Sequence, residues 1–162
     1  MIRVKLKRLH EQAIHPSRGT PMSLGLDLHA IALTEDGRPS KILIPPKTTR
    51  NIATGWAILP WQPAKVTQDY ANLETWLHAV CSRSGLASKS IFVANAPGII
   101  DPDYRGEIKI LLYNGGVESY YVQHGDRVAQ LVSIKATLSD VELVSDVGDS
   151  KRGAAGFGST GQ

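Results

Sequence analysis

Short apolar stretches separated by turn-forming residues run along most of this chain. Residues 2–9 alternate apolar with basic, so that Ile2, Val4 and Leu6 share one face, a period of two that is typical of a strand buried on one side. Further apolar runs bounded by proline, glycine or aspartate predict strands. These runs are residues 23–30, 42–44, 48–59, 119–122, 127–134 and 141–144, with a strand pair expected in 48–59. The pattern favours an all-β domain.

One segment departs from this alternation. From residue 68 onward the apolar side chains recur at helical spacing, and Asp69 is a suitable N-cap. The residues that carry this spacing are Tyr70, Leu73, Trp76, Leu77 and Val80. The spacing predicts one short helix near residues 69–80.

Residues 94–114 hold the densest group of chemically useful side chains. Asp-Pro-Asp at 101–103 predicts a turn, because proline presets φ and aspartate bonds back to its own backbone. The alternation over residues 106–110 then predicts a β-hairpin with Asp101 and Tyr104 near its tip. A solvated acidic turn has the same composition. A carboxylate beside an aromatic ring and an open backbone edge is also what a small-molecule pocket needs, with the acid available as a base.

Three other places offer polar groups that suit an anionic ligand. Asp27 lies within an apolar strand pattern, where a carboxylate needs either hydrogen bonds from backbone amides or a cation. Arg83, Ser84 and Gly85 supply a guanidinium, a hydroxyl and unshielded backbone N–H groups, which suit phosphate oxygens, although such triplets are common in surface loops. Gln130 either faces solvent from its strand or contacts a ligand.

The C-terminal residues 148–162 contain one large apolar side chain, Phe157, and therefore predict a flexible tail. The same residues could fold over a nucleotide. In that case Phe157 would lie on the base, Arg152 on a terminal phosphate, and the hydroxyls of Ser159 and Thr160 on phosphate oxygens.

Composition narrows the function classes. The 162 residues, 42% of them hydrophobic, suffice for one domain with a core. A single cysteine, Cys81, excludes an intrachain disulfide and a cysteine-based metal site, and fits a reducing compartment. No stretch has the length of a membrane span, and the N-terminus lacks a signal-peptide core, so we expect a cytoplasmic protein. The net charge of +3 comes from scattered basic residues, which favours a small polyanion over nucleic acid as partner.

The segment at residues 98–106 resembles the central motif of the trimeric dUTP pyrophosphatases (dUTPases), Gly-x-Ile-Asp-x-x-Tyr-Arg-Gly. Four further strings resemble the other motifs of that family, in the same order. They are Gly-x-Asp-Leu-x-Ala at 25–30, Arg-Ser-Gly-Leu-Ala at 83–87, Gly-Asp-Arg-Val-Ala-Gln-Leu at 125–131 and the glycine-rich ending at 152–161. Leu24, Ser82 and Ala155 differ from the residues that are usual in these motifs. Residues 61–80 lie where this chain is longer than bacterial members of the family, so we treat them as an insert.

The resemblance implies a distorted β jelly roll over residues 1–147 and a closing arm over 148–162. It implies a homotrimer whose active sites lie between subunits, with the arm of one chain covering a neighbour's site. The implied activity is hydrolysis of dUTP to dUMP and pyrophosphate, which keeps uracil out of DNA and supplies dUMP for thymidylate synthesis.

The resemblance also implies a role for each site residue. Asp101 would be the general base for a water attacking the α-phosphorus, and Mg²⁺ the cofactor, with Asp27 acting on it through water. Uracil and deoxyribose would be bound by Asn95, Gly98, Ile100, Tyr104 and Phe157. The phosphates would be bound by Arg83, Ser84, Gly85, Gln130, Arg152, Gly158, Ser159 and Thr160.

Two alternatives remain at this point. A dCTP deaminase shares the fold and the trimer, but that family carries an Arg-Ser-Ser string and a different hairpin with a catalytic glutamate. A phage-type dUTPase that also binds a regulatory protein would use the insert at residues 61–80 as the partner surface.

Overall fold

The described part of the chain is almost entirely β-structure. A computed structural model describes residues 3–59 and 74–154 of the protein. Its strands are β1 (Lys5–Arg8), β2 (Leu26–His29), β3 (Lys41–Ile44), β4 (Thr49–Leu59), β5 (Glu74–Cys81), β6 (Ile91–Val93), β7 (Gly98–Ile100), β8 (Glu107–Asn114), β9 (Tyr120–Gln123) and β10 (Arg127–Thr137). The helix α1 covers only Ser84–Ala87. The all-β prediction is confirmed, and no helix in the described ranges has the length and apolarity to span a membrane.

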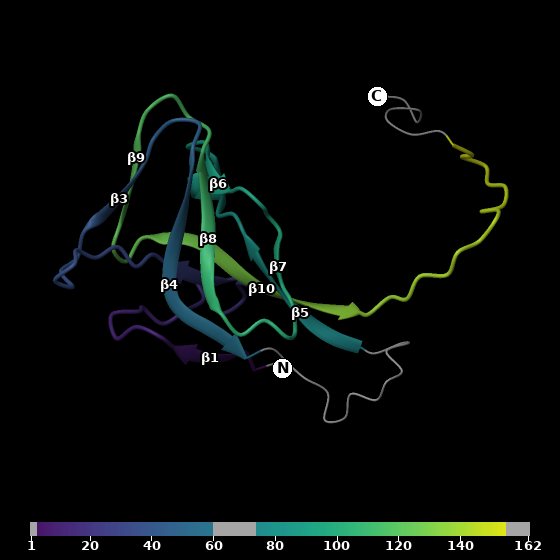
Figure 1. Cartoon of the computed structure of the whole chain (residues 1–162), viewed down its shortest axis with the longest axis horizontal. Helices are drawn as coiled ribbons and strands as arrows, with labels where there is room; N and C mark the ends of the chain where they lie inside the picture. The colour runs from purple at the N-terminus through teal and green to yellow at the C-terminus, as the bar shows by residue number, and fades with distance from the viewer. Residues whose placement is uncertain (1–2, 60–73, 155–162) are drawn as a thin grey trace.

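The strands form two facing sheets with the core between them. One sheet has the order β1-β4-β8-β6 and the other β2-β10-β5-β7, while β3 and β9 form a separate ribbon. Figure 1 shows β4 and β8 crossing β5 and β10, with the β3–β9 ribbon at one side. Both sheets and the ribbon contribute to one buried aliphatic cluster, which includes Leu28, Ile44, Ile52, Ile110, Leu112, Val122 and Leu131. This two-layer arrangement agrees with the expected jelly roll, and burying each such side chain contributes about 1.5–3 kcal/mol.

The helix predicted near residues 69–80 is wrong where the structure describes it. Residues 74–81 form β5, an inner strand that pairs with β10 on one side and β7 on the other. Pairing on both edges satisfies the backbone of β5, and His78 and Val80 face the core from alternate positions. Tertiary pairing therefore overrides a short helical pattern. The rest of the predicted helix, residues 69–73, lies outside the described residues.

The hairpin predicted around residues 94–114 is also wrong in its pairing. β7 pairs with β5, whereas β8 pairs with β4 and β6, so the two strands belong to different sheets. The turn over residues 101–106 carries the chain from one sheet to the other. Because no ladder closes the space between β7 and β8, a pocket can open there.

Residues 48–59 form one strand, β4, instead of the expected pair. Its register with β8 shifts between Ala53 and Ala57, which marks a bulge at Gly55. Gly55 has φ of 71°, and a Cβ there would overlap Ile31 Cδ1 and lie 2.7 Å from Ala13 Cβ. Glycine is therefore required by both conformation and space.

The last predicted strand, at residues 141–144, does not form in this chain. Figure 1 shows residues 138–154 running away from the two sheets. Val141, Leu143 and Val147 are 81%, 94% and 95% exposed. Within the described residues this segment has the alternation of a strand but no strand to pair with.

The buried imidazole of His78 makes stability depend on pH. Its Nδ1 lies 2.9 Å from Ser133 Oγ, and burial lowers the pKa of His78 below 6.5. The imidazole therefore takes up a proton at a higher pH in the unfolded chain than in the folded chain. The contribution of neutral His78 to the free energy of unfolding is complete above pH 6.5 and declines as the pH falls below 6.5.

Substitution of His78 tests this pH dependence. We expect the urea midpoint to drop between pH 7.5 and 5.5, and to drop less in His78→Asn. The exposed His15, replaced by Asn, is the control and should retain the wild-type slope; an unchanged slope in His78→Asn would contradict the assignment.

Candidate functional site

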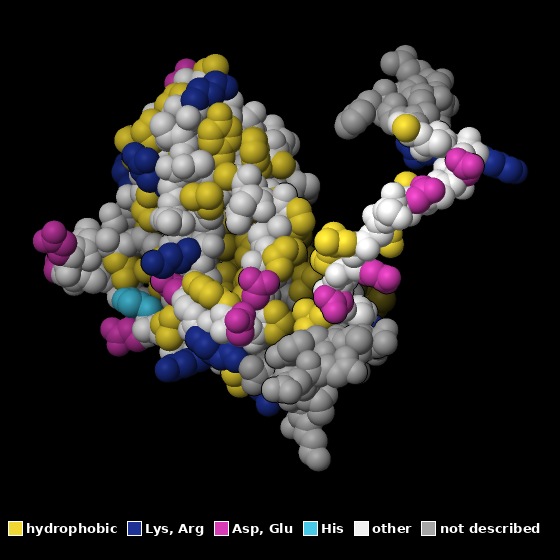
Figure 2. Space-filling model, turned by 45° about the vertical axis from the view of Figure 1, so that its right-hand side comes forward, with side chains coloured by type: hydrophobic (Ala, Val, Ile, Leu, Met, Phe, Trp, Pro, Cys, Tyr) yellow, Lys and Arg dark blue, Asp and Glu magenta, His cyan; other side chains and the backbone are white. Residues whose placement is uncertain are grey.

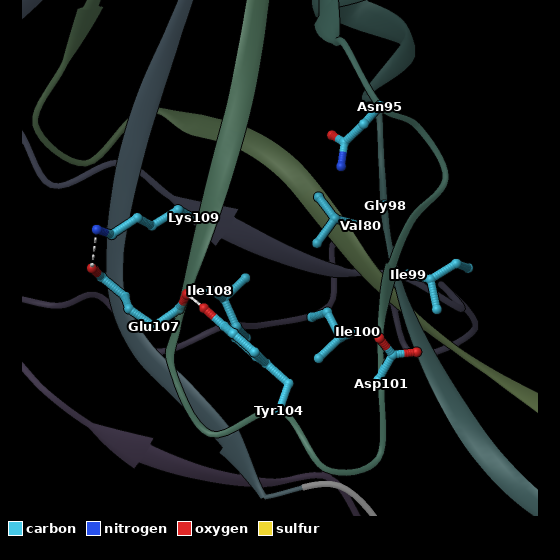
Figure 3. A pocket seen from close by; sticks show the side chains of 10 residues that line it. All are labelled: Val80, Asn95, Gly98, Ile99, Ile100, Asp101, Tyr104, Glu107, Ile108 and Lys109. Carbon is cyan, nitrogen blue, oxygen red and sulfur yellow. Dashed lines mark hydrogen bonds and ion pairs between the residues drawn. The ribbon is translucent and has the colours of Figure 1, made fainter.

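A pocket of about 200 Å³ lies between β7 and β8. Figure 3 shows Asn95 at one end and Tyr104 at the other, with aliphatic side chains between them. Its lining residues are Val80, Asn95, Gly98, Ile99, Ile100, Asp101, Tyr104, Glu107, Ile108 and Lys109. An apolar floor with a few polar groups at the rim is typical of a small-molecule site. The structure thus brings Asn95, Gly98, Ile100, Asp101 and Tyr104 together, as the sequence predicted.

The turn at the pocket mouth is closed by its own backbone and by Arg105. The Tyr104 N–H donates to the Asp101 carbonyl at 3.1 Å, and Arg105 Nη1 donates to the carbonyls of Pro102 and Tyr104, both at 2.9 Å. In the described ranges the Asp101 carboxylate makes no hydrogen bond or ion pair. A carboxylate held on a closed turn with open lone pairs can accept a proton from a bound water.

The other end of the pocket presents backbone groups. β7 is the last strand of its sheet, so the edge away from β5 carries N–H and C=O groups outside the ladder. The side chain of Asn95 packs on Gly98, whose Cβ position would be 3.1 Å from Asn95 Nδ2. Donors and acceptors of both kinds are therefore available to read the edge of a heterocycle.

A second cluster surrounds Asp27 on β2. Arg83 Nε lies 2.9 Å from Asp27 Oδ1, and Arg127 Nη1 lies 3.2 Å from Asp27 Oδ2. The Asp27 side chain is only 14% exposed, so it needs these cations. The sequence left open whether Asp27 accepts hydrogen bonds from backbone amides or pairs with a cation, and the structure shows the pairing with cations. Sequence reasoning did not place Arg127 in the site; its position opposite His29 in the ladder, next to Asp27, is a tertiary fact.

Gln130 joins this second cluster. It lies opposite Asp27 on one side and Cys81 on the other, and its Nε2 donates to the Ser82 carbonyl at 3.1 Å. Gly25 lies directly on this side chain, because a Cβ at Gly25 would overlap Gln130 Oε1 and come within 3.1 Å of Gln130 Cβ. The predicted phosphate residues Ser84 and Gly85, both exposed, begin α1 immediately after Arg83.

The two clusters lie far apart within one chain. Ile100 pairs with His78, which places Asp101 beside Leu77, whereas Gln130 pairs with Cys81. Four residues along β5 separate the two levels, roughly 13 Å at the rise of a strand. Asp27 is displaced further, since β2 and β7 are the opposite edges of their sheet.

Other predicted site residues are not brought to either cluster. Arg152 lies in the C-terminal segment that runs away from the sheets (Figure 1). Phe157, Gly158, Ser159 and Thr160 lie outside the described residues, so their roles stay predictions. Conversely, the sequence reasoning missed five lining residues, Val80, Ile99, Glu107, Ile108 and Lys109. The strand alternation of Glu107, Ile108 and Lys109 is visible in the sequence, whereas the spacing placed Val80 in a helix. The crossing between sheets that turns these residues toward the pocket is not visible in the sequence.

The described residues do not form a resident metal centre. They contain no group of three or more His, Cys, Asp or Glu side chains placed to hold a metal ion. Both Asp27 oxygens are engaged by arginines. Mg²⁺ prefers phosphate oxygens and water, so an ion at this site would come with a triphosphate ligand.

Comparison with known proteins decides the family. The dUTPase family model matches residues 74–161, more than half of the chain. The chain is 38% identical over 160 residues to the deoxyuridine 5'-triphosphate nucleotidohydrolase of Helicobacter hepaticus, covering 98% of this chain and 88% of that protein. The chain belongs to the dUTPase family.

Solved dUTPase structures share the fold. The dUTPase of Staphylococcus bacteriophage 80alpha with dUPNHPP has a TM-score of 0.78 at 22% identity, with 100% of each chain covered. A variant dUTPase from phage phi11 of S. aureus, described with a structural Mg(II) ion, has a TM-score of 0.70 at 19% identity, covering 91% of this chain and 100% of that one. At these identities the likeness concerns the jelly-roll fold alone.

The contact between Gly25 and Gln130 yields a test of the second cluster. Gly25→Ala should displace the Gln130 amide and weaken binding of a non-hydrolysable dUTP analogue roughly tenfold, about the effect of one hydrogen bond to a charged group. Titration calorimetry would measure the affinity. In a Gln130→Ala background, where only the 3.1 Å contact with the Cβ of residue 130 is left, Gly25→Ala should cost less affinity than it does in the wild type. An equal loss in both backgrounds would contradict the coupling.

Proposed function

We propose that this dUTPase hydrolyses dUTP to dUMP and pyrophosphate with Asp101 as general base. The observation that carries the proposal is the Asp101 carboxylate, which has no hydrogen-bond or ion-pair partner in the described part of the chain and lies at the mouth of the pocket beside Tyr104. Membership of the dUTPase family supplies the reaction class.

The chemical step needs one ionised carboxylate and one water. Asp101 takes a proton from the water as its oxygen bonds to the α-phosphorus, and the bond from that phosphorus to the bridging oxygen breaks, releasing pyrophosphate. Ser84 is not the nucleophile, because no histidine base adjoins it in the chain. The water attacks directly.

Charge on the triphosphate is neutralised around the second cluster. Arg83 and Arg152 bind phosphate oxygens, and Gln130, Ser84 and Gly85 donate hydrogen bonds. Mg²⁺, when bound, would supply further positive charge at the triphosphate. Asp27 holds Arg83 in place through the 2.9 Å pair and would help to hold Mg²⁺ through water. This division of work fits a reaction that depends mainly on positioning and electrostatics.

Specificity for the nucleoside comes from the first pocket. The Asn95 amide and the open backbone edge of β7, including Gly98 and Ile100, read uracil, and the narrow space excludes a thymine methyl. Tyr104 packs under the deoxyribose and excludes a 2′-hydroxyl. Phe157, from the arm, covers the base.

The separation of the two clusters favours a site shared between subunits of a homotrimer. The three phosphates are linked by single oxygen bridges, so a triphosphate is much shorter than the distance from Asp101 to Asp27 in one chain. A site in which the pocket of one subunit faces the arginine cluster of its neighbour removes this mismatch. The arm then closes over the site of a neighbour.

Charge and shape support such an assembly. A groove of about 450 Å³ at the open edges of β1 and β2 is lined partly by Val4, Leu6, Leu26 and Trp56. Residues 3–8 beside it carry only basic charges, whereas residues 138–149 carry only acidic ones. Figure 2 shows acidic side chains interspersed with apolar ones along that C-terminal segment. The segment of one subunit complements the β1 edge of another.

Replacing the general base tests the mechanism. Asp101→Asn should lower kcat for dUTP by a factor of about 10² to 10⁴, with the Kd of a non-hydrolysable analogue nearly unchanged, because the amide fills the same space but cannot take a proton. Pyrophosphate release and calorimetry would measure the two effects. Substantial turnover by the pure variant would refute the role of Asp101.

Mixing two inactive variants tests the shared site. Asp101→Asn and Arg83→Ala, refolded together, should regain activity, since each mixed trimer contains one site with both natural residues. Each variant refolded alone is the control. Activity no greater than the sum of the two controls would contradict a site built from two subunits.

Assay products separate the remaining alternatives. Pyrophosphate from dUTP is expected, whereas ammonia from dCTP would indicate the deaminase reaction. A partner at residues 61–80 stays a prediction. A pull-down that compares the full chain with a variant lacking residues 61–73, which leaves β5 in place, would test it.

A further inference from the structure

The ring of Tyr104 is fixed from two directions. Its hydroxyl donates to the Glu107 carbonyl at 2.9 Å. Gly106 lies directly beneath the ring, because a Cβ there would overlap the hydroxyl and lie 2.6 Å from Cζ and 3.0 Å from Cε2. The φ of Gly106 is outside the left-handed region, so glycine is needed here for space and not for conformation.

The carbonyl that receives the tyrosine is itself held by the Glu107 side chain. Glu107 Oε1 accepts the Gly55 N–H in the bulge of β4 at 2.8 Å, and the Gly55 carbonyl accepts the Leu9 N–H at 2.8 Å. The Thr54 hydroxyl adds a 2.6 Å bond to the Ile108 carbonyl. The bulge is therefore tied to the first residues of β8, where the turn ends.

The Glu107 carboxylate acts through this backbone contact more than through its neighbouring charge. Its distance to Lys109 Nζ is 3.9 Å, and the lysine side chain is 55% exposed, so this ion pair contributes little. The Glu107 side chain is 22% exposed, and the bond to Gly55 is partly buried. Figure 3 shows Tyr104 reaching the Glu107 backbone while the glutamate side chain turns away from the ring.

We propose that Gly106 and Glu107 are positioning residues that set the discrimination between deoxyribose and ribose. This inference rests on the proposed function. Gly106 lets the hydroxyl end of the ring lie close to the backbone, and Glu107 keeps the accepting carbonyl in place. A ring held on both sides cannot retreat from a sugar that carries a 2′-hydroxyl. Loss of the bond to Glu107 gives the ring room to move, and a Cβ at residue 106 displaces the ring from its place. In either case UTP can enter.

The test is the ratio of kcat/KM for dUTP to kcat/KM for UTP. Gly106→Ala and Glu107→Ala should each lower this ratio about tenfold or more, the scale of discrimination expected from a shape change at a pocket wall. Glu107→Gln should retain the wild-type ratio, because its amide oxygen still accepts the Gly55 N–H. Gly19→Ala is the matched control, since its Cβ would meet only Ser23 Oγ at 3.7 Å.

Tyr104→Phe provides a second variant in case Gly106→Ala does not fold. It removes only the bond to Glu107 and should also lower the ratio. An unchanged ratio in Glu107→Ala and Tyr104→Phe, or an equal loss of both activities with no change in ratio, would overturn the inference. A wild-type enzyme that fails to hydrolyse dUTP would instead contradict the proposed function.

Discussion

The turn between β7 and β8 joins two sheets instead of closing a hairpin, and the site depends on this crossing. A paired hairpin would fill the space between its strands with backbone hydrogen bonds. Here each strand pairs elsewhere, so the space between them is lined by Val80, Ile100 and Ile108 and open at the rim. The crossing must then be stabilised by contacts of its own, which Arg105 and Tyr104 supply.

The bulge at Gly55 extends this constraint into the scaffold. Glycine there relieves a clash with Ile31 and Ala13 and aims an N–H at the Glu107 carboxylate. The carbonyl of Gly55 accepts a hydrogen bond from the N–H of Leu9, which follows β1. A functional turn is thus connected to the interior of the first sheet through a few hydrogen bonds that involve buried or half-buried groups, where such bonds hold geometry most firmly.

The arginine cluster around Asp27 fixes the positions of charged side chains. Asp27 is a nearly buried carboxylate between two guanidinium groups, and a buried ion pair adds little to the free energy of unfolding but holds its members in place. It fixes the guanidinium of Arg83 beside β2 and β10, and Arg83 immediately precedes α1, where Ser84 and Gly85 are exposed. This cluster and the pocket lie at different levels and edges of one sheet, which supports the proposal of a site shared between subunits. Among the described residues, nothing covers the exposed apolar side chains of residues 141–147 either.

What the sequence by itself determined was local chemistry: the aspartate at the turn, the Arg-Ser-Gly string, the alternation of most strands and the family that these motifs resemble. Periodicity failed at residues 74–80, because a few apolar residues fit either a helix or a strand, and the decision fell to the backbone partners that β10 and β7 offer. It failed again at β7 and β8, since neighbours in sequence need not be neighbours in a ladder. Arg127 and Glu107 acquired their positions through contacts 100 and 52 residues away along the chain. Only the tertiary structure brings such distant residues together, because strand pairing is set by the whole sheet and not by the segment that pairs.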